Sequence, residues 1–316
     1  MTRSLNKQSR IYVAGQNTLI GSAIHRQLKL QGFGGIVGGG WEPNPAVASE
    51  VGDFFSDTRP EYVFAAAGPS GGIGANERFP ADLMYENLLS ACHVIESAFR
   101  YGSRKLLYLA SSCTYPRHCS QPMSVSSLLS GPLESTSQYY ALSKLAGIYL
   151  CDAFRKQHGA SFISGIPAEV FGPGDDFDPQ RSHVVAALIA KMHDAKESSA
   201  PEVEIWGTGT PRREFVFADD LADACILSML NYDDSPPLNL GSGVALSIRE
   251  LAEVIREVLG YGGALRFNAA RPDGTPVKLL DSTKLRELGW SAGTTLRESL
   301  SITYQWFLEN RTISSQ

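Results

Sequence analysis

Cysteine is scarce in this chain of 316 residues, and the few cysteines show no spacing that would link them. Their odd number and the lack of a Cys-x-x-Cys pair argue against a disulfide framework and against a structural zinc site. We therefore expect no bound metal and reduced thiols, which indicate a cytoplasmic protein. The five are Cys92, Cys113, Cys119, Cys151 and Cys225.

Long apolar runs and runs of basic residues are missing as well. No run reaches the roughly 18 apolar residues of a membrane-spanning helix. The polar start, MTRSLNKQSR, lacks the apolar core of a signal peptide. A formal net charge of −5 with scattered lysines and arginines gives no electrostatic reason to expect nucleic acid or a membrane as partner. With 43% hydrophobic residues, the chain can bury a sizeable globular core.

What is present is an alternation of strand-like and helix-like runs from residue 10 onwards. Strict alternation of this kind predicts an α/β fold, a Rossmann doubly wound parallel sheet with helices on both faces. The strand-like runs lie at 10–15, 34–39, 61–68, 105–112 and 161–167, and the helical runs at 20–32, 48–60, 80–102 and 138–159.

The rhythm changes after residue 175, which predicts a second, smaller lobe of mixed α/β structure. A helix near 183–196 is followed by short strand candidates at 203–207 and 213–220 and by helices at 220–231 and 247–260. We divide the chain into a Rossmann dinucleotide-binding domain, 1–175 with a return segment near 214–240, and a mainly substrate-binding domain, 176–316.

The first candidate site is the segment VAGQNTLIGSA, where the first strand turns into the first helix. Glycines at 15 and 21 would let a pyrophosphate lie against free backbone N–H groups at the helix N-terminus. The usual extra glycine inside such a turn is missing, and Thr18 stands in its place. An ordinary strand-to-helix turn would look similar, so this segment alone does not decide the matter.

The second candidate site is YYALSK, where Tyr140 and Lys144 are four residues apart on one helix face. The ammonium group should stabilise a tyrosinate and lower the phenol pKa toward neutrality, so that Tyr140 can pass a proton to a ketone. Ser111, at the end of the strand-like run KLLYLASS, offers a second hydrogen-bond donor. An amphipathic helix can carry Tyr and Lys by chance, but glycine turn, serine and Tyr-x-x-x-Lys in this order are typical of short-chain dehydrogenases.

Longer strings make the resemblance more specific. The chain resembles the GDP-L-fucose synthase family of extended short-chain dehydrogenases over about residues 10–310. The resemblance implies 3,5-epimerisation and 4-keto reduction of a GDP-4-keto-6-deoxyhexose with NADP(H), NAD(H) being possible. It also implies a homodimer formed through the helices at 80–101 and 138–158. The strings are LASSCTYP, GPLESTSQYYALSKLAGIYLCDAF, SHVVAAL, VEIWGTGTPRREFVFADD, RPDGTPVKLLD and TYQWFLEN.

The resemblance also assigns roles to residues. Cys113 and His183 become the base and acid that invert C3 and C5, beside a C4 ketone that acidifies both C–H bonds. Ser111, Tyr140 and Lys144 become the catalytic residues of the reduction. A cysteine in the core and a structural histidine are the alternatives. The cofactor-binding residues implied are Gly15, Asn17, Thr18, Leu19, Ile20, Gly21, Ala66, Tyr140, Lys144, Pro167 and His183, and the substrate-binding residues are Ser111, Glu169, Lys191, Trp206, Arg213, Asp273 and Lys278.

The departures from the family pattern lie among the residues expected to bind the cofactor and the substrate. Asn17 replaces an arginine that faces the cofactor's 2′-phosphate, and no arginine occurs between residues 27 and 58, so Glu42 becomes a candidate partner of ribose hydroxyls instead. Glu169 replaces an amide, and Lys191 replaces an arginine and loses its fork geometry. Two alternatives stay open: a 3,5-epimerase without reductase activity, and a non-catalytic nucleotide-binding relative.

Overall fold

The computed structural model describes residues 5–39, 41–271 and 273–311. Its main feature is a five-stranded sheet in the order β1-β2-β3-β4-β8, in which every pairing is parallel. Its first three strands are buried along their whole length, as expected of a sheet covered on both faces. The strands are β1 (Ile11–Ala14), β2 (Tyr62–Ala65), β3 (Lys105–Leu109), β4 (Ser161–Pro167) and β8 (Leu238–Leu240).

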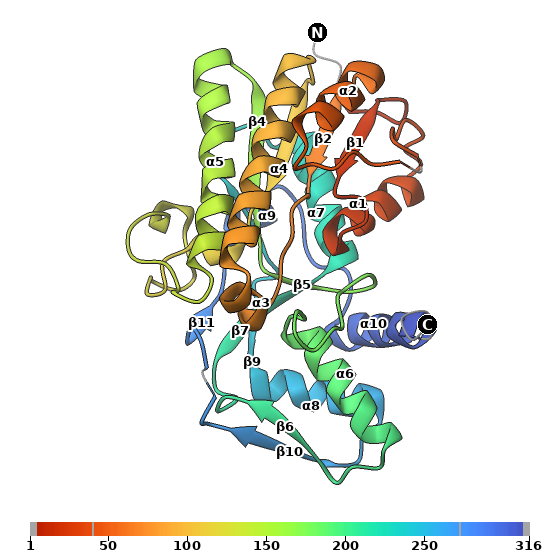
Figure 1. Ribbon diagram of the computed structural model, residues 1–316, viewed down its shortest axis with the longest axis vertical. Coiled ribbons are helices and arrows are strands. Elements are labelled where there is room, and N and C mark those ends of the chain that lie inside the picture. Colours follow the sequence, from red (N-terminus) through yellow and green to blue (C-terminus); the bar gives the residue numbers. More distant parts are fainter. Residues whose placement is uncertain (1–4, 40, 272, 312–316) are drawn as a thin grey trace.

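Helices cover both faces of this sheet, which confirms the predicted doubly wound α/β fold. One layer contains α2, α4 and α5, and α4 and α5 stand side by side in Figure 1; α1 packs on α7 in the other layer. The bounds are α1 (Leu19–Leu30), α2 (Ala48–Thr58), α4 (Pro80–Arg100), α5 (Gln138–His158) and α7 (Ala218–Asn231).

The strand-like run at 34–39 does not form a strand. Only Ile36 pairs, through a single parallel bridge to Ile11 at the open edge of β1. Glycine is a poor strand former because it has no side chain to pack and loses the most backbone entropy. Gly35 is also pressed against the chain, since a Cβ there would lie 2.1 Å from the Ser9 carbonyl oxygen. The segment thus follows the sheet edge as a loop, toward the turn after β1.

A second lobe, drawn below the large sheet in Figure 1, contains the smaller sheets. One small sheet has the order β11-β7-β5, with β9 antiparallel to β7, and β6 pairs with β10. The strand predicted at 213–220 ends earlier, because Ala218 begins α7. The elements of this lobe are β5 (Glu169–Phe171), β6 (Glu202–Trp206), β7 (Arg212–Phe217), β9 (Ala245–Ser247), β10 (Ala264–Asn268), β11 (Val277–Lys278), α6 (Val184–Glu197), α8 (Ile248–Leu259) and α10 (Leu296–Arg311). The other elements are α3 (Ile73–Arg78), which contacts α4, α9 (Thr283–Glu287), which contacts β8, and the 3₁₀ turns η1 (Ser112–Thr114) and η2 (Val125–Ser127).

Buried apolar side chains gather in two clusters, one for each lobe. The larger includes the five strands of the main sheet and the buried face of α7. The smaller joins α6, α8 and α10 and runs from Phe171 to Phe307. This distribution supports the division near residue 175 with its return segment, which stays a prediction. In the described ranges, no helix is long and apolar enough to cross a bilayer.

A buried carboxyl group near the start of the second lobe gives the fold a testable pH dependence. Asp175 accepts a hydrogen bond from the Asp176 amide at 2.8 Å through Oδ1, while its buried Oδ2 has no partner among the described residues. Burial raises the pKa of Asp175 to about 7. The folded state therefore binds a proton that the unfolded chain releases, and stability falls as pH rises from about 4 to about 7.

We expect Asp175→Asn to raise the free energy of unfolding at pH 8 by about 4 kcal/mol and to change it much less at pH 4.5. Urea denaturation at both pH values measures the difference. Asp53→Asn, an exposed change on α2, is the matched control and should show no such pH dependence. Equal effects of Asp175→Asn at the two pH values would contradict the assignment.

Candidate active site

Most of the predicted cofactor-binding and catalytic residues lie at the carboxyl edge of the main sheet, the usual ligand-binding edge of a doubly wound fold. Gly15 follows β1 with φ of +84°, and a Cβ there would lie 2.7 Å from the Ala66 carbonyl oxygen beyond β2. At Gly21 a Cβ would lie 1.9 Å from the Gly15 carbonyl oxygen. Both positions therefore require glycine, and together they shape a tight turn. Pro167 ends β4 at the same edge.

Thr18, which stands where a glycine was expected, is the N-cap of α1. Its Oγ1 accepts a hydrogen bond from the Gly21 amide at 3.1 Å and donates to the Gly15 carbonyl at 2.7 Å. Threonine just before a helix is a known capping signal, and the sequence reading overlooked it. Leu19 and Ile20 begin the helix, where amides have no intrahelical acceptor. The turn thus fits the pyrophosphate of a dinucleotide.

A carboxylate from the loop after residue 40 lies against this turn. Glu42 Oε1 accepts hydrogen bonds from the Gly15 amide and, at 3.1 Å, from the Gln16 amide. Glu42 Oε2 lies 3.4 Å from the side-chain amide of Asn17. Burial raises the pKa of Glu42 although these donors favour the ionised form. The candidate named from sequence for the ribose hydroxyls is therefore at the cofactor turn.

Ser111 and Tyr140 meet just beyond the end of β3. The Ser111 hydroxyl accepts a hydrogen bond from the Cys113 amide at 3.2 Å and caps η1. It also hydrogen-bonds to the Tyr140 phenol near the start of α5. Burial and the nearby Cys113 raise the pKa of Tyr140, which is opposite to the predicted lowering, because they outweigh the Ser111 hydrogen bond. The phenol is therefore protonated at neutral pH, the form that a proton donor requires.

Lys144 lies one turn further along α5 and is buried. Its Nζ is 5.8 Å from the centroid of the Tyr140 ring and 3.4 Å from the Leu109 carbonyl oxygen. Burial lowers the pKa of Lys144 to about 8. The spacing of Tyr140 and Lys144 in the sequence thus placed them together correctly.

Cys113 has a cationic neighbour that belongs to the other lobe. Lys278 Nζ, on β11, lies 3.6 Å from the Cys113 sulfur. Lys278, a predicted contact of the nucleotide sugar, thus also lies beside the thiol. His183 is the N-cap residue of α6, and burial lowers its pKa, with Lys278 lowering and Glu169 raising it. His183 is therefore mainly neutral at pH 7, so it can accept or, once protonated, return a proton.

The predicted sugar-binding residues form two groups. In the first, Arg213 is buried, and its Nε lies 3.3 Å from Glu169 Oε1. Its guanidinium also lies 3.5 Å from the Asp273 carbonyl oxygen, while the Asp273 carboxylate accepts from the Thr208 amide at 2.7 Å. A small pocket reaches both Glu169 of this group and Lys278; its lining is Ser112, Met123, Ala168, Glu169, Glu214, Lys278 and Leu280.

In the second group, Trp206 offers an aromatic face at the end of β6. The side chain is 53% exposed, with Lys191 Nζ at 5.2 Å and the Arg271 guanidinium at 4.7 Å from the ring centroid. Burial lowers the pKa of Lys191. An aromatic flanked by two cations suits a planar base joined to a diphosphate. Arg271 was missed from the sequence, although it begins the quoted string RPDGTP.

The doubly wound fold and the residues at the carboxyl edge of the main sheet define the class of the protein. A family model described as the NAD dependent epimerase/dehydratase family matches residues 11–241, and the chain belongs to that family.

Individual relatives narrow the class. The chain is 47% identical to GDP-L-fucose synthase 1 of Arabidopsis thaliana, over 96% of this chain and 95% of the relative. A crystal structure of a GDP-6-OMe-4-keto-L-xylo-heptose reductase from C. jejuni matches with a TM-score of 0.91 at 30% identity, over 98% of this chain and 100% of that one. A GDP-mannoheptose C4 reductase from Campylobacter jejuni with NADP bound has a TM-score of 0.86 at 31% identity, covering 96% and 99%. The predicted resemblance to GDP-L-fucose synthases is confirmed.

Proposed function

We propose that this protein is a nicotinamide-dependent epimerase and reductase that inverts C3 and C5 of a GDP-linked 4-keto-6-deoxyhexose and then reduces C4. The observation that carries the proposal is one connected set of groups: Ser111 bonds both the Tyr140 phenol and the Cys113 amide, and Cys113 contacts Lys278. A proton donor for the C4 oxygen and a thiol for the neighbouring carbons thus lie side by side.

In the epimerisation, Cys113 and His183 move protons at the two carbons beside the ketone. Cys113 removes a proton as the thiolate and returns one as the thiol, with the Lys278 ammonium 3.6 Å from its sulfur. His183, neutral because burial lowers its pKa, is the partner on the other side. Ser111 holds η1 so that the Cys113 sulfur keeps its place beside Tyr140.

For the reduction, a nicotinamide cofactor would supply the hydride to C4. Tyr140 gives its proton to the C4 oxygen, Ser111 donates a second hydrogen bond to that oxygen, and Lys144 stabilises the tyrosinate that forms. The Campylobacter jejuni reductase with NADP bound supports a nicotinamide dinucleotide at this turn, where NADP(H) and NAD(H) share the same pyrophosphate contacts. The pyrophosphate would be held by Gly15, Thr18, Leu19, Ile20 and Gly21. The rest of the cofactor-binding site would be lined by Ala66, Pro167, Lys144 and His183.

The GDP part of the substrate would lie over the second lobe. Trp206 with Lys191 and Arg271 would hold the base and diphosphate, and Arg213 with Asp273 the region nearer the sugar. Glu169, already paired with Arg213, adds an acceptor for sugar hydroxyls.

The proposal is tested with GDP-4-keto-6-deoxymannose in deuterated water, supplying NADPH and NADH separately. Cofactor oxidation is followed by absorbance and deuterium at C3 and C5 by mass spectrometry. We expect deuterium uptake together with cofactor consumption. Uptake without consumption would favour the 3,5-epimerase alternative, and the absence of both would contradict catalysis on this substrate.

The lowered pKa of Lys144 predicts that the reductase activity declines at alkaline pH. Because that pKa is about 8, the ammonium is lost as pH rises through this value, and the tyrosinate loses its support. Reduction should fall about tenfold per pH unit above the titration. In Lys144→Arg the guanidinium stays charged, so any remaining activity should fall only at higher pH. Identical pH profiles of cofactor oxidation for the two enzymes would contradict the assignment.

We further propose a homodimer through α4 and α5, working in the cytoplasm, where its five free thiols stay reduced. The two helices expose Tyr85, Tyr139, Leu142 and Tyr149, each at least 41% accessible. On α5, the last three share one face at helical spacing.

We expect Tyr149→Arg to make the protein monomeric, because a charge would be buried at the interface. Light scattering after gel filtration measures the mass. Leu30→Arg, which changes an exposed leucine on α1, is the control and should stay dimeric. A dimeric Tyr149→Arg would place the interface elsewhere.

A further inference from the structure

We propose that Glu42 sets the cofactor specificity of this protein, so that NAD(H) is bound in preference to NADP(H). This inference rests on the proposed function, because it concerns the dinucleotide turn of the same site. It starts from a contact that joins two segments more than 20 residues apart, the turn after β1 and the loop before α2.

The Glu42 carboxylate is built into the turn. One oxygen accepts from the consecutive amides of Gly15 and Gln16, and the other faces the Asn17 side chain at 3.4 Å. In dinucleotide-binding folds, an acidic residue about 20 positions after the glycine turn accepts hydrogen bonds from the adenosine ribose hydroxyls. Glu42 has the chemistry and the place for that role, and its remaining lone pairs are free to accept them.

The same region offers no positive charge to an extra phosphate. The sequence contains no lysine, arginine or histidine from residue 30 to residue 58, but four acidic residues occur there: Glu42, Glu50, Asp53 and Asp57. A 2′-phosphate normally requires charge-assisted donors, above all arginine. Here it would meet a carboxylate instead.

Basic residues that flank β1 and α1 have partners of their own. Lys7 donates to the Gln31 carbonyl, and Arg10 donates to the Arg59 carbonyl at 2.8 Å. Arg26 is paired with Asp219 at 2.5 Å. Each would have to give up its present partner to reach a phosphate at the turn.

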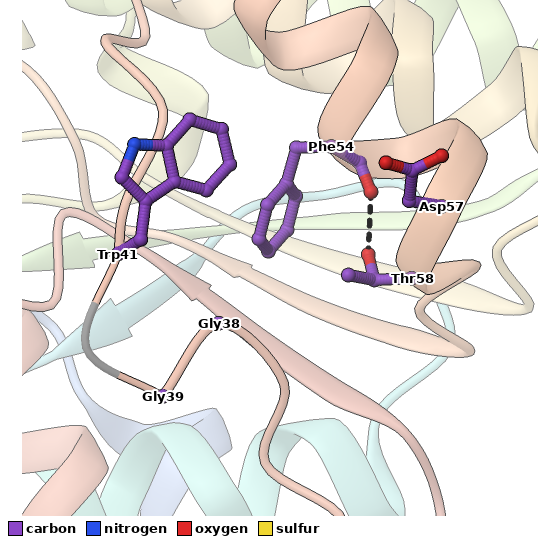
Figure 2. A pocket seen from close by; sticks show the side chains of 6 residues that line it. All are labelled: Gly38, Gly39, Trp41, Phe54, Asp57 and Thr58. Atoms are coloured by element: carbon purple, nitrogen blue, oxygen red, sulfur yellow. Dashed lines mark hydrogen bonds between the residues drawn. The ribbon is translucent and has the colours of Figure 1, made fainter.

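The loop that carries Glu42 is held in place from both sides. Trp41 packs on Phe54 of α2 with ring centroids 5.8 Å apart. Together with Gly38 and Gly39, the two rings line a cavity of about 230 Å³. Figure 2 shows these residues. On the far side, His93 Nδ1 lies 3.1 Å from the Pro45 carbonyl oxygen. A carboxylate fixed in this way cannot simply turn away from a 2′-phosphate.

The test measures binding of NAD⁺ and NADP⁺ to the whole protein by isothermal titration calorimetry, without sugar. We expect NAD⁺ to bind at least about tenfold more tightly. Glu42→Gln keeps the acceptor oxygen but removes the charge, so it should tighten NADP⁺ binding about tenfold relative to NAD⁺. Asn17→Arg leaves the carboxylate in place, adds a cation and should shift the ratio in the same direction. Asp53→Asn removes an acidic charge away from the turn and should leave the ratio unchanged.

Tighter binding of NADP⁺ by the wild type would overturn the inference and leave the proposed function intact. A wild type that prefers NAD⁺, with an unchanged ratio in both Glu42→Gln and Asn17→Arg, would overturn the role of Glu42. Binding of neither nucleotide would contradict the proposed function itself.

Discussion

Cys113→Ser should lose deuterium exchange at C3 and C5 of the 4-keto sugar by about 100-fold or more. A serine hydroxyl is far less acidic than a thiol, so the Lys278 ammonium 3.6 Å away cannot keep it ionised at neutral pH. The volume hardly changes, and the Cys113 amide that bonds Ser111 is retained. Binding of the dinucleotide should therefore stay the same within about twofold.

The measurement is deuterium incorporation by mass spectrometry without reduced cofactor, with calorimetric binding of the dinucleotide on the same samples. Cys119→Ser, a second half-buried thiol outside the site, is the matched control and should exchange like the wild type. Wild-type exchange in Cys113→Ala would mean that the thiol only fills space.

Tyr140→Phe should stop cofactor oxidation while the sugar still exchanges deuterium. The phenol is the group whose raised pKa keeps a proton available beside Ser111, and phenylalanine has none to give. Loss of a general acid of this kind lowers the rate by about 10²–10⁴-fold. Exchange should continue because Cys113, Lys278 and His183 are untouched.

Both signals come from one reaction mixture, in which absorbance reports cofactor oxidation and mass spectrometry reports exchange. The neighbouring Tyr139 is 46% exposed, so Tyr139→Phe removes a hydroxyl from the adjacent residue and is the control. Simultaneous loss of exchange and oxidation in Tyr140→Phe would contradict the division of labour between phenol and thiol.

The local features of the site were predictable from the sequence. Tyr140 and Lys144 share a helix face, and Ser111 follows a buried strand, so short-range periodicity is enough to bring them to one edge of the sheet. The strand at 34–39 was over-predicted, because a strand also needs side chains that pack, and this run is largely glycine.

Contacts between distant segments were not predictable in the same way. The approach of Lys278 to Cys113 depends on the pairing of β11 with β7, and no pattern within either segment encodes it. The contact of Glu42 with the Gly15 amide likewise depends on how a glycine-rich loop crosses the sheet edge. Thr18 is different: its capping role was encoded locally and was overlooked.

The contact between Lys278 and Cys113 also joins the two lobes. The lysine lies on β11 of the small sheet, and the cysteine lies in η1, the turn that follows β3 of the main sheet. Any motion that draws β11 away from η1 would separate the Lys278 ammonium from the Cys113 sulfur. The rate at which a thiol-directed reagent modifies Cys113 would therefore report on the separation of the two lobes.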